Sequence, residues 1–180
     1  MSTYSVEIAG VRRELPVVPV GAGTRIAFLK LYGDLELVDA AISALHTRLD
    51  SRAEVILGPE TGGILLAHLL ARSSGVPYVA ARKKTRPDMR APIRARVNSI
   101  GTPGGQQLFL GEDDAASLHD RRVALIDEVV SSGGTVDALR ELVDTAGGRV
   151  VQVLAVATEG ERRADVTSLC HLPLFPATAE

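Results

Sequence analysis

Short apolar runs alternate with helical segments along most of this chain, and this alternation constrains the fold more than any other feature of the sequence. Buried strands are predicted at 55–57, 76–81, 123–126 and 150–157. Helices are predicted at 35–50, 64–71 and 136–146. Strands that alternate with helices form a parallel sheet that helices cover on both faces. The sequence therefore predicts an α/β fold, a parallel sheet flanked by helices.

The length of 180 residues suits a single domain, 1–180, with enough chain to bury a core. We expect the core at about 34–158, with 1–33 and the less regular tail 159–180 forming an accessory hood. Alternating polar and apolar residues predict a hairpin in the first of these end segments, from 4–8 and 11–18 with a turn at Ala9 and Gly10. A short apolar strand is predicted at 25–32.

Composition excludes several classes of protein. Aromatic residues make up 3% of the chain, too few for a base-stacking platform, and the net charge of −2 argues against a general nucleic-acid binder. The single cysteine, Cys170, excludes an intramolecular disulfide and a multi-cysteine metal site. Neither a signal peptide nor a membrane-spanning segment is evident, so we expect a cytoplasmic protein without a membrane partner.

The segment after the third predicted strand carries the most chemical information. Asp127 and Glu128 follow four apolar residues, which places two carboxylates at the carboxyl edge of the sheet, where α/β folds bind ligands. Small, hydroxylated and glycine residues follow and lead into a helix: Ser131, Ser132, Gly133, Gly134 and Thr135. Such a loop surrounds a phosphate with amides and hydroxyls. The pattern indicates a ligand with both hydroxyls and a phosphate, such as a sugar phosphate.

The segment Asp127 to Thr135 resembles the phosphoribosyl pyrophosphate signature of the type I phosphoribosyltransferases, in particular the adenine phosphoribosyltransferase-like branch. The order of the other segments is similar to that family. Gly58 to Gly63 occupies the place of its pyrophosphate loop, and Arg82 to Lys84 the basic end of its second strand. Thr85 to Arg122 occupies the place of its flexible hood. The resemblance covers about residues 25–175.

The resemblance implies roles for the residues of the motif. The ribose 5-phosphate would be held by Ser131, Ser132, Gly133, Gly134 and Thr135. The 2- and 3-hydroxyls of the ribose would bind Asp127 and Glu128. Mg²⁺ is the implied cofactor, because pyrophosphate and hydroxyl oxygens are the hard ligands it prefers. The two carboxylates would contribute to the metal site indirectly, through the ribose hydroxyls or through water.

The leaving pyrophosphate needs a second set of donors. Thr61 and Gly62 supply backbone amides but no positive charge, whereas relatives often carry Arg or Lys near this point. Glu60 is either an exposed loop acid or a residue that orients these amides or holds the metal through water. Cationic contacts to the pyrophosphate are predicted for Arg82, Lys83, Lys84 and Arg86, with the two lysines acting on the leaving group.

A hairpin is predicted within the segment Thr85 to Arg122, from 93–99 and 106–110 with a turn at 103–105. It is either a movable flap that excludes water or a rigid hairpin. Three aromatic residues could stack on a purine, but core packing is expected for each: Phe28, Tyr32 and Phe109.

The expected reaction is transfer of a 5-phosphoribosyl group from phosphoribosyl pyrophosphate to a purine-like base, adenine favoured, with release of pyrophosphate. Ser131 argues against the hypoxanthine–guanine branch, which carries an Asp there as a base. The family expectation is a homodimer with small-molecule substrates. Two alternatives remain open: a regulator that senses phosphoribosyl pyrophosphate without catalysis, and a transferase for an unusual heterocycle.

Overall fold

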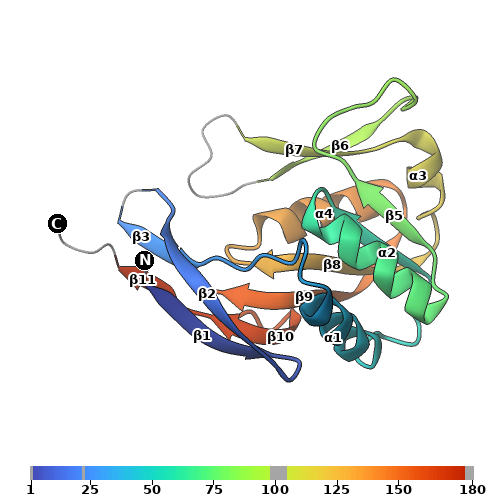
Figure 1. Ribbon diagram of the computed structural model, residues 1–180. Coiled ribbons are helices and arrows are strands. Elements are labelled where there is room, and N and C mark those ends of the chain that lie inside the picture. Colours follow the sequence, from blue (N-terminus) through green and yellow to red (C-terminus); the bar gives the residue numbers. More distant parts are fainter. Residues whose placement is uncertain (1, 22, 98–104, 177–180) are drawn as a thin grey trace.

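A five-stranded parallel sheet forms the centre of the computed structural model, which describes residues 2–21, 23–97 and 105–176 (Figure 1). Its strand order is β10-β9-β8-β4-β5, and every neighbouring pair is parallel. The strands are β4 (Val55–Pro59), β5 (Tyr78–Ala81), β8 (Arg122–Val130), β9 (Arg149–Glu159) and β10 (Thr167–Leu172). The predicted α/β fold is confirmed.

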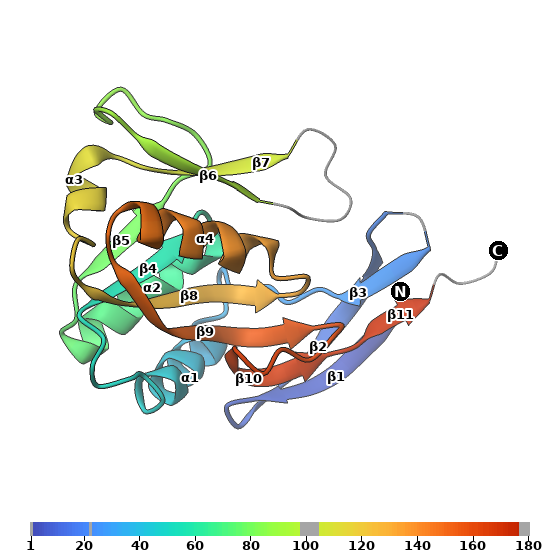
Figure 2. The same cartoon turned by 180° about the vertical axis from the view of Figure 1, so that it is seen from behind.

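Helices cover both faces of this sheet (Figures 1 and 2). The apolar sides of α1 (Leu35–His46) and α2 (Gly62–Ser74) share one buried cluster with side chains of β8 and β9, Ile126 and Leu154 among them. The apolar side of α4 (Gly134–Thr145) belongs to a second cluster on the opposite face. A short helix, α3 (Glu112–Ala116), precedes β8. None of the described helices is long and apolar enough to cross a membrane.

The predicted hairpin is present as β6 (Ile93–Val97) and β7 (Gln106–Leu110), paired antiparallel. It lies over α4 in both views (Figures 1 and 2). Its inward side chains are buried in the cluster of α4: Ala95, Val97, Leu108 and Leu110. The two strands are therefore part of the core, while the expected turn at 103–105 lies mostly outside the described residues.

The N-terminal strands form a second, four-stranded sheet in the order β1-β2-β3-β11. Its strands are β1 (Thr3–Ile8), β2 (Val11–Pro19), β3 (Thr24–Ala27) and β11 (Leu174–Pro176). The predicted hairpin is confirmed, and its two-residue turn has positive φ at both Ala9 and Gly10, 51° and 83°. Ile8 and Leu15 pack in the same cluster as α1, so this sheet covers one end of the molecule.

In the N-terminal segment and the tail, the sequence patterns misplaced the end of one strand and did not predict two others. The strand expected over 25–32 ends at Ala27, because its pairing with β2 and β11 ends there. The chain then leaves the sheet and buries Leu29 and Leu31 against the α1 cluster. In the tail, β10 extends the central sheet as a fifth strand and β11 joins the N-terminal sheet.

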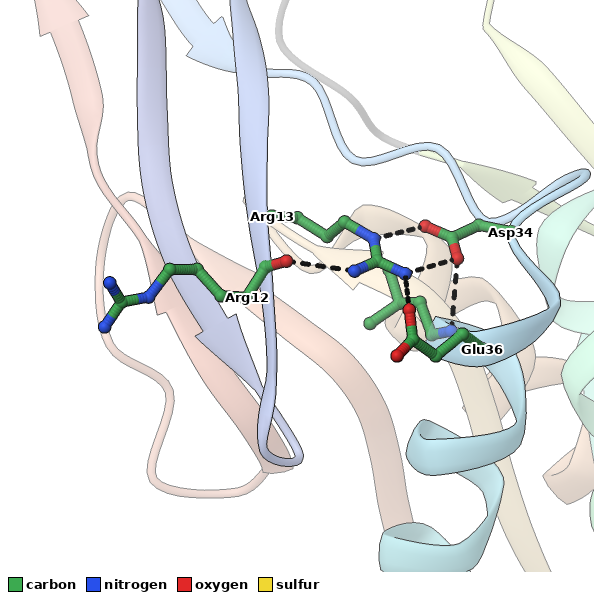
Figure 3. A network of polar contacts seen from close by, with 5 residues as sticks. Arg12, Arg13, Asp34 and Glu36 are labelled. Atoms are coloured by element: carbon green, nitrogen blue, oxygen red, sulfur yellow. Dashed lines mark hydrogen bonds and ion pairs between the residues drawn. The ribbon is translucent and has the colours of Figure 1, made fainter.

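A polar network joins the N-terminal sheet to α1 (Figure 3). Asp34 caps the helix, since its Oδ1 accepts a hydrogen bond from the Leu37 amide at 3.2 Å. Arg13 on β2 donates to both oxygens of Asp34, at 2.7 and 2.8 Å, and to Glu36 at 2.7 Å. The hydrogen bond from Arg13 lowers the pKa of Asp34 to about 2. One arginine thus holds the second sheet against the helix that packs on the first.

Candidate functional site

The loop between β8 and α4 forms a small pocket of about 70 Å³, lined by Asp127 and residues 129–136. Gly133 has a φ of 87°, a conformation that only glycine adopts readily, and it precedes the first turn of α4. No side chain of the described residues caps this helix, so its first amides face the pocket region without a side-chain acceptor. The predicted sequence of strand, small-residue loop and helix is present.

The acid pair lies inside β8 rather than after it. The strand was expected to end at Ile126, but pairing with β9 continues to Val130, which pairs with Thr158. Asp127 Oδ1 accepts a hydrogen bond from the Glu128 amide at 2.8 Å. Burial raises the pKa of Asp127 to about 7, the neighbouring charge of Glu128 adds to this, and the hydrogen bond works against it. Burial also raises the pKa of Glu128.

The loop between β4 and α2 touches this acid pair. The peptide bond between Glu60 and Thr61 is cis. A Cβ atom at Gly62 would collide with the Glu128 carboxylate, and a Cβ at Gly63 would collide with the Pro59 ring. Glycine at these positions therefore lets the first loop approach the carboxylates of the central strand. The structure brings together two segments that are far apart in the sequence, as the predicted site requires.

The basic segment after β5 divides between two places. The Lys83 amide donates to Glu60 Oε2 at 2.9 Å, and the charge of Lys83 acts to lower the pKa of Asp127. Arg82 lies 4.0 Å from Glu60 Oε1, and Arg86 pairs with Asp88 at 3.7 Å.

Arg82 and Arg86 also line a separate pocket of about 320 Å³ beside β5, together with acidic residues of 112–114. Lys84 is exposed. Of the predicted cations, Lys83 is thus the one that an electrostatic contact links to Asp127.

Two aromatic residues lie on the surface instead of in the core. Phe28 is 48% exposed and Tyr32 45% exposed, so the expected core packing is wrong for both. The pKa of Tyr32 is raised by its partial burial and then by the charges of Glu128 and Asp127. The Tyr32 ring therefore lies near the acid pair. The chain departs from β3 before these residues, and that departure exposes them.

Arg163, in the connection between β9 and β10, also reaches the site. Its Nη1 donates to the Ser132 carbonyl at 3.2 Å, and a Cβ at Gly133 would collide with its guanidinium. Sequence reasoning missed this residue because its segment has no periodicity and its contact with the loop depends on the pairing of β9 with β8. The signal in the sequence was only a charged residue near the end of a predicted strand.

Comparisons with known proteins agree with this geometry. Residues 32–171 match the model of the phosphoribosyl transferase domain family. The adenine phosphoribosyltransferase of Corynebacterium efficiens is 32% identical over 149 residues, 76% of this chain and 76% of that one. HGPRTase-like protein 3 of Haloterrigena turkmenica is 28% identical over 142 residues, 76% of this chain and 73% of that one.

Solved structures share the fold. The adenine phosphoribosyltransferase of Thermoanaerobacter pseudethanolicus superposes with a TM-score of 0.72 at 23% identity, covering 87% of this chain and 95% of that one. The enzyme from Giardia lamblia, complexed with 9-deazaadenine, has a TM-score of 0.72 at 22% identity and covers 87% and 93%. With the family model matched over most of its length and a small-residue loop behind an acid pair on its central strand, this chain belongs to the phosphoribosyl transferase family.

Proposed function

We propose that this protein transfers the 5-phosphoribosyl group of phosphoribosyl pyrophosphate to a purine-like base, adenine favoured, and releases pyrophosphate. The observation that carries the proposal is the contact between the loop at Gly62 and Glu128, on the strand that leads into the phosphate loop. That contact supports an assignment in which donors for two phosphate groups flank the two carboxylates. The relatives named adenine phosphoribosyltransferase support adenine as the base.

The 5-phosphate is assigned to residues 131–135. Ser131 and Ser132 are exposed, and the amides of the first turn of α4 carry the positive end of the helix dipole. Asp127 and Glu128 accept hydrogen bonds from the ribose hydroxyls. When the bond at C1 of the ribose breaks, positive charge develops on the ring, and two nearby carboxylates stabilise that charge.

The pyrophosphate is assigned to Thr61, Gly62 and the basic segment. The charge of Lys83 acts to lower the pKa of Asp127, and Lys84 follows it in the sequence; both lysines are exposed. Glu60 accepts from the Lys83 amide and so aligns the end of β5 with this loop. Arg82 and Arg86 supply further positive charge at the edge of the sheet.

The donor set fits Mg²⁺ only together with the substrate. Among the described residues no three acidic, histidine or cysteine side chains converge on one point, so the protein alone builds no complete cage. Mg²⁺ commonly takes one or two carboxylates and completes its shell with phosphate oxygens and water. We assign it to Asp127 and Glu128, through the ribose hydroxyls or water. When bound, the ion neutralises charge on the departing pyrophosphate.

Release of pyrophosphate tests the proposal. With Mg²⁺ and phosphoribosyl pyrophosphate, we expect adenine to give pyrophosphate and adenosine monophosphate in equal amounts, and a paired Asp127→Asn, Glu128→Gln variant to give neither. Tight binding of phosphoribosyl pyrophosphate without product from any purine or pyrimidine would instead establish the non-catalytic regulator. Product from another heterocycle alone would contradict the adenine assignment. Two observations favour testing such a base: the uncharged Thr61-Gly62-Gly63 loop and the HGPRTase-like relative.

We also propose that the protein acts in the cytoplasm as a homodimer. The support for the dimer is the family expectation, and three exposed apolar side chains are available to a second copy: Leu35 at 76% exposure, Leu174 at 51% and Val20 at 42%. Sedimentation equilibrium measures the mass directly, and a mass near 19 kDa would contradict the dimer.

A further inference from the structure

Arg163 lies over the phosphate loop, although it comes from a different part of the chain. It belongs to the connection between β9 and β10, and its side chain is 22% exposed. Its Nη1 donates to the carbonyl oxygen of Ser132 at 3.2 Å. The same guanidinium fills the space that a side chain at Gly133 would need. Two features therefore require glycine at 133: its positive φ, and the lack of space for a Cβ atom beside the Arg163 guanidinium.

The Arg163 guanidinium is held in place by carboxylates. Its Nε and Nη2 donate to the two oxygens of Asp165, at 3.1 and 2.9 Å, in the forked geometry that suits a planar guanidinium. Nη2 also lies 3.9 Å from Asp137 in the first turn of α4. These contacts leave Nη1 directed at the loop. An arginine fixed in this way loses little conformational freedom when a ligand arrives.

The contact with Ser132 fixes the direction of one amide of the loop. The Ser132 carbonyl and the Gly133 N–H belong to one planar peptide group and, when it is trans, point in opposite directions. Because the carbonyl points to Arg163, the Gly133 N–H points away from it. The charge of Arg163 also offsets the negative charge of Asp137, which stands at the helix end where an anion would bind.

We infer that Arg163 is a positioning residue for the 5-phosphate of the substrate: it holds the loop at Ser132 and Gly133 in the conformation that binds the phosphate, without needing to touch the ligand. This inference rests on the proposed assignment of residues 131–135 to the 5-phosphate. It makes the β9–β10 connection a part of the site, although that segment carries no recognisable motif.

Binding of two half-substrates tests the inference. Calorimetric titration measures the dissociation constants of ribose 5-phosphate, which carries the 5-phosphate alone, and of pyrophosphate with Mg²⁺. For Arg163→Ala we expect ribose 5-phosphate to bind about tenfold more weakly, as for loss of a charged hydrogen bond, and pyrophosphate to bind unchanged. In steady state, KM for phosphoribosyl pyrophosphate should rise by a similar factor, with kcat nearly constant.

Two further variants separate positioning from other roles. Arg140→Ala is the matched control, since Arg140 shares the Asp165 carboxylate at 3.3 Å but has no contact with residues 131–135 among the described hydrogen bonds and ion pairs. We expect it to bind ribose 5-phosphate like the unmodified protein. Arg163→Lys keeps the charge but cannot form the fork with Asp165 and reach Ser132 together. We expect it to recover less than half of the lost affinity, and it replaces the alanine variant if that one does not fold.

Distinct outcomes overturn distinct claims. If the unmodified protein does not bind ribose 5-phosphate, the assignment of the phosphate loop is wrong, and the inference falls with it. If the unmodified protein binds it and Arg163→Ala binds it equally well, the inference alone is wrong. If Arg163→Lys recovers the full affinity for ribose 5-phosphate, the positive charge alone accounts for the effect, and the guanidinium does not position the loop. Equal losses for ribose 5-phosphate and pyrophosphate, or a matching loss in Arg140→Ala, would mean that the arginine only supports the fold.

Discussion

At the scale of single residues, the site combines groups that are unfavourable for folding. Asp127 stands in the central strand of the sheet, where burial raises the pKa of its carboxyl group to about 7. In the unfolded chain the same group loses its proton near its ordinary pKa of 3.8. Folding therefore takes up a proton between these two values, and the stability contributed by this site falls as the pH rises from about 4 to about 7. A carboxylate kept at this position is better explained by ligand binding than by stability.

Replacing this carboxylate should stabilise the fold and weaken binding. Asn keeps the shape of the side chain and an oxygen for the Glu128 amide, but it has no charge to bury. For Asp127→Asn we expect the free energy of unfolding at pH 8 to increase by about 2 kcal/mol. The upper limit is about 4 kcal/mol, which corresponds to a rise of the Asp127 pKa from 3.8 to about 7. Ribose 5-phosphate should bind about 1–3 kcal/mol more weakly. Denaturant unfolding at pH 8 and pH 5 checks the sign; a gain as large at pH 5 as at pH 8 would show that ionisation is not the cause.

At the scale of elements, the loops that follow β4, β5 and β8 meet at one edge of the sheet. Parallel strands place their carboxyl ends together, so residues distant in the sequence can act on one ligand. The hydrogen bond from the Lys83 amide to Glu60 joins the loops after β5 and β4. The contact of Gly62 with Glu128 joins the loop after β4 to the end of β8. We expect the loop after β8 to bind the 5-phosphate and the loops after β4 and β5 to bind the pyrophosphate.

Removing the two lysines after β5 should affect the leaving group alone. In the Lys83→Ala, Lys84→Ala variant we expect kcat to fall about a hundredfold, because charge on the departing pyrophosphate loses its cations. Binding of adenosine monophosphate, which has the 5-phosphate but no pyrophosphate, should change less than threefold. Steady-state rates and product-inhibition constants measure both effects.

The matched control for the lysines is Arg94→Ala with Arg96→Ala, which removes the same charge from the exposed side of β6. This pair should leave both constants unchanged. If monophosphate binding falls as far as the rate in the lysine variant, the lysines serve the 5-phosphate or the fold, and the two phosphate assignments are reversed or wrong.

At the scale of the whole molecule, two buried clusters lie on opposite faces of the central sheet. One contains α1, α2 and residues of the N-terminal sheet, and the other contains α4 and both strands of the hairpin. The strands of the hairpin thus contribute to the core of the domain. Arg13 joins the N-terminal sheet to α1 in the same way, by fixed contacts.

This arrangement predicts that damage to the hairpin destabilises the entire domain. Leu110 on β7 is fully buried, and Leu110→Ala should lower the free energy of unfolding by about 2–5 kcal/mol, the usual cost of truncating a buried leucine. Fluorescence and circular dichroism should report the same single transition at a lower temperature. Fast hydrogen exchange confined to residues 93–110, with an unchanged melting temperature, would instead show that the hairpin is an independent flap.

Local patterns in the sequence determined the central architecture and the core of the motif. Apolar runs and glycine stops predicted four of the five parallel strands and three helices, because buried strands and amphipathic helices depend on residues close in the chain. The order of carboxylates, small residues and helix between Asp127 and Thr135 likewise needs no distant contact to be recognised. The expected N-terminal hairpin follows from the same kind of local signal, a turn at Ala9 and Gly10.

Tertiary structure decided everything that depends on a partner distant in sequence. The length of β8 depends on its pairing with β9. The exposure of Phe28 and Tyr32 depends on the residue at which the pairing of β3 ends. The fifth strand, β10, forms because it can pair with the edge of β9. Arg163 reaches the phosphate loop only because the β9–β10 connection folds back over it. Hydrogen-bond partners and burial are properties of the assembled chain, so neither the raised pKa of Asp127 nor the place of Arg163 is written in any short segment.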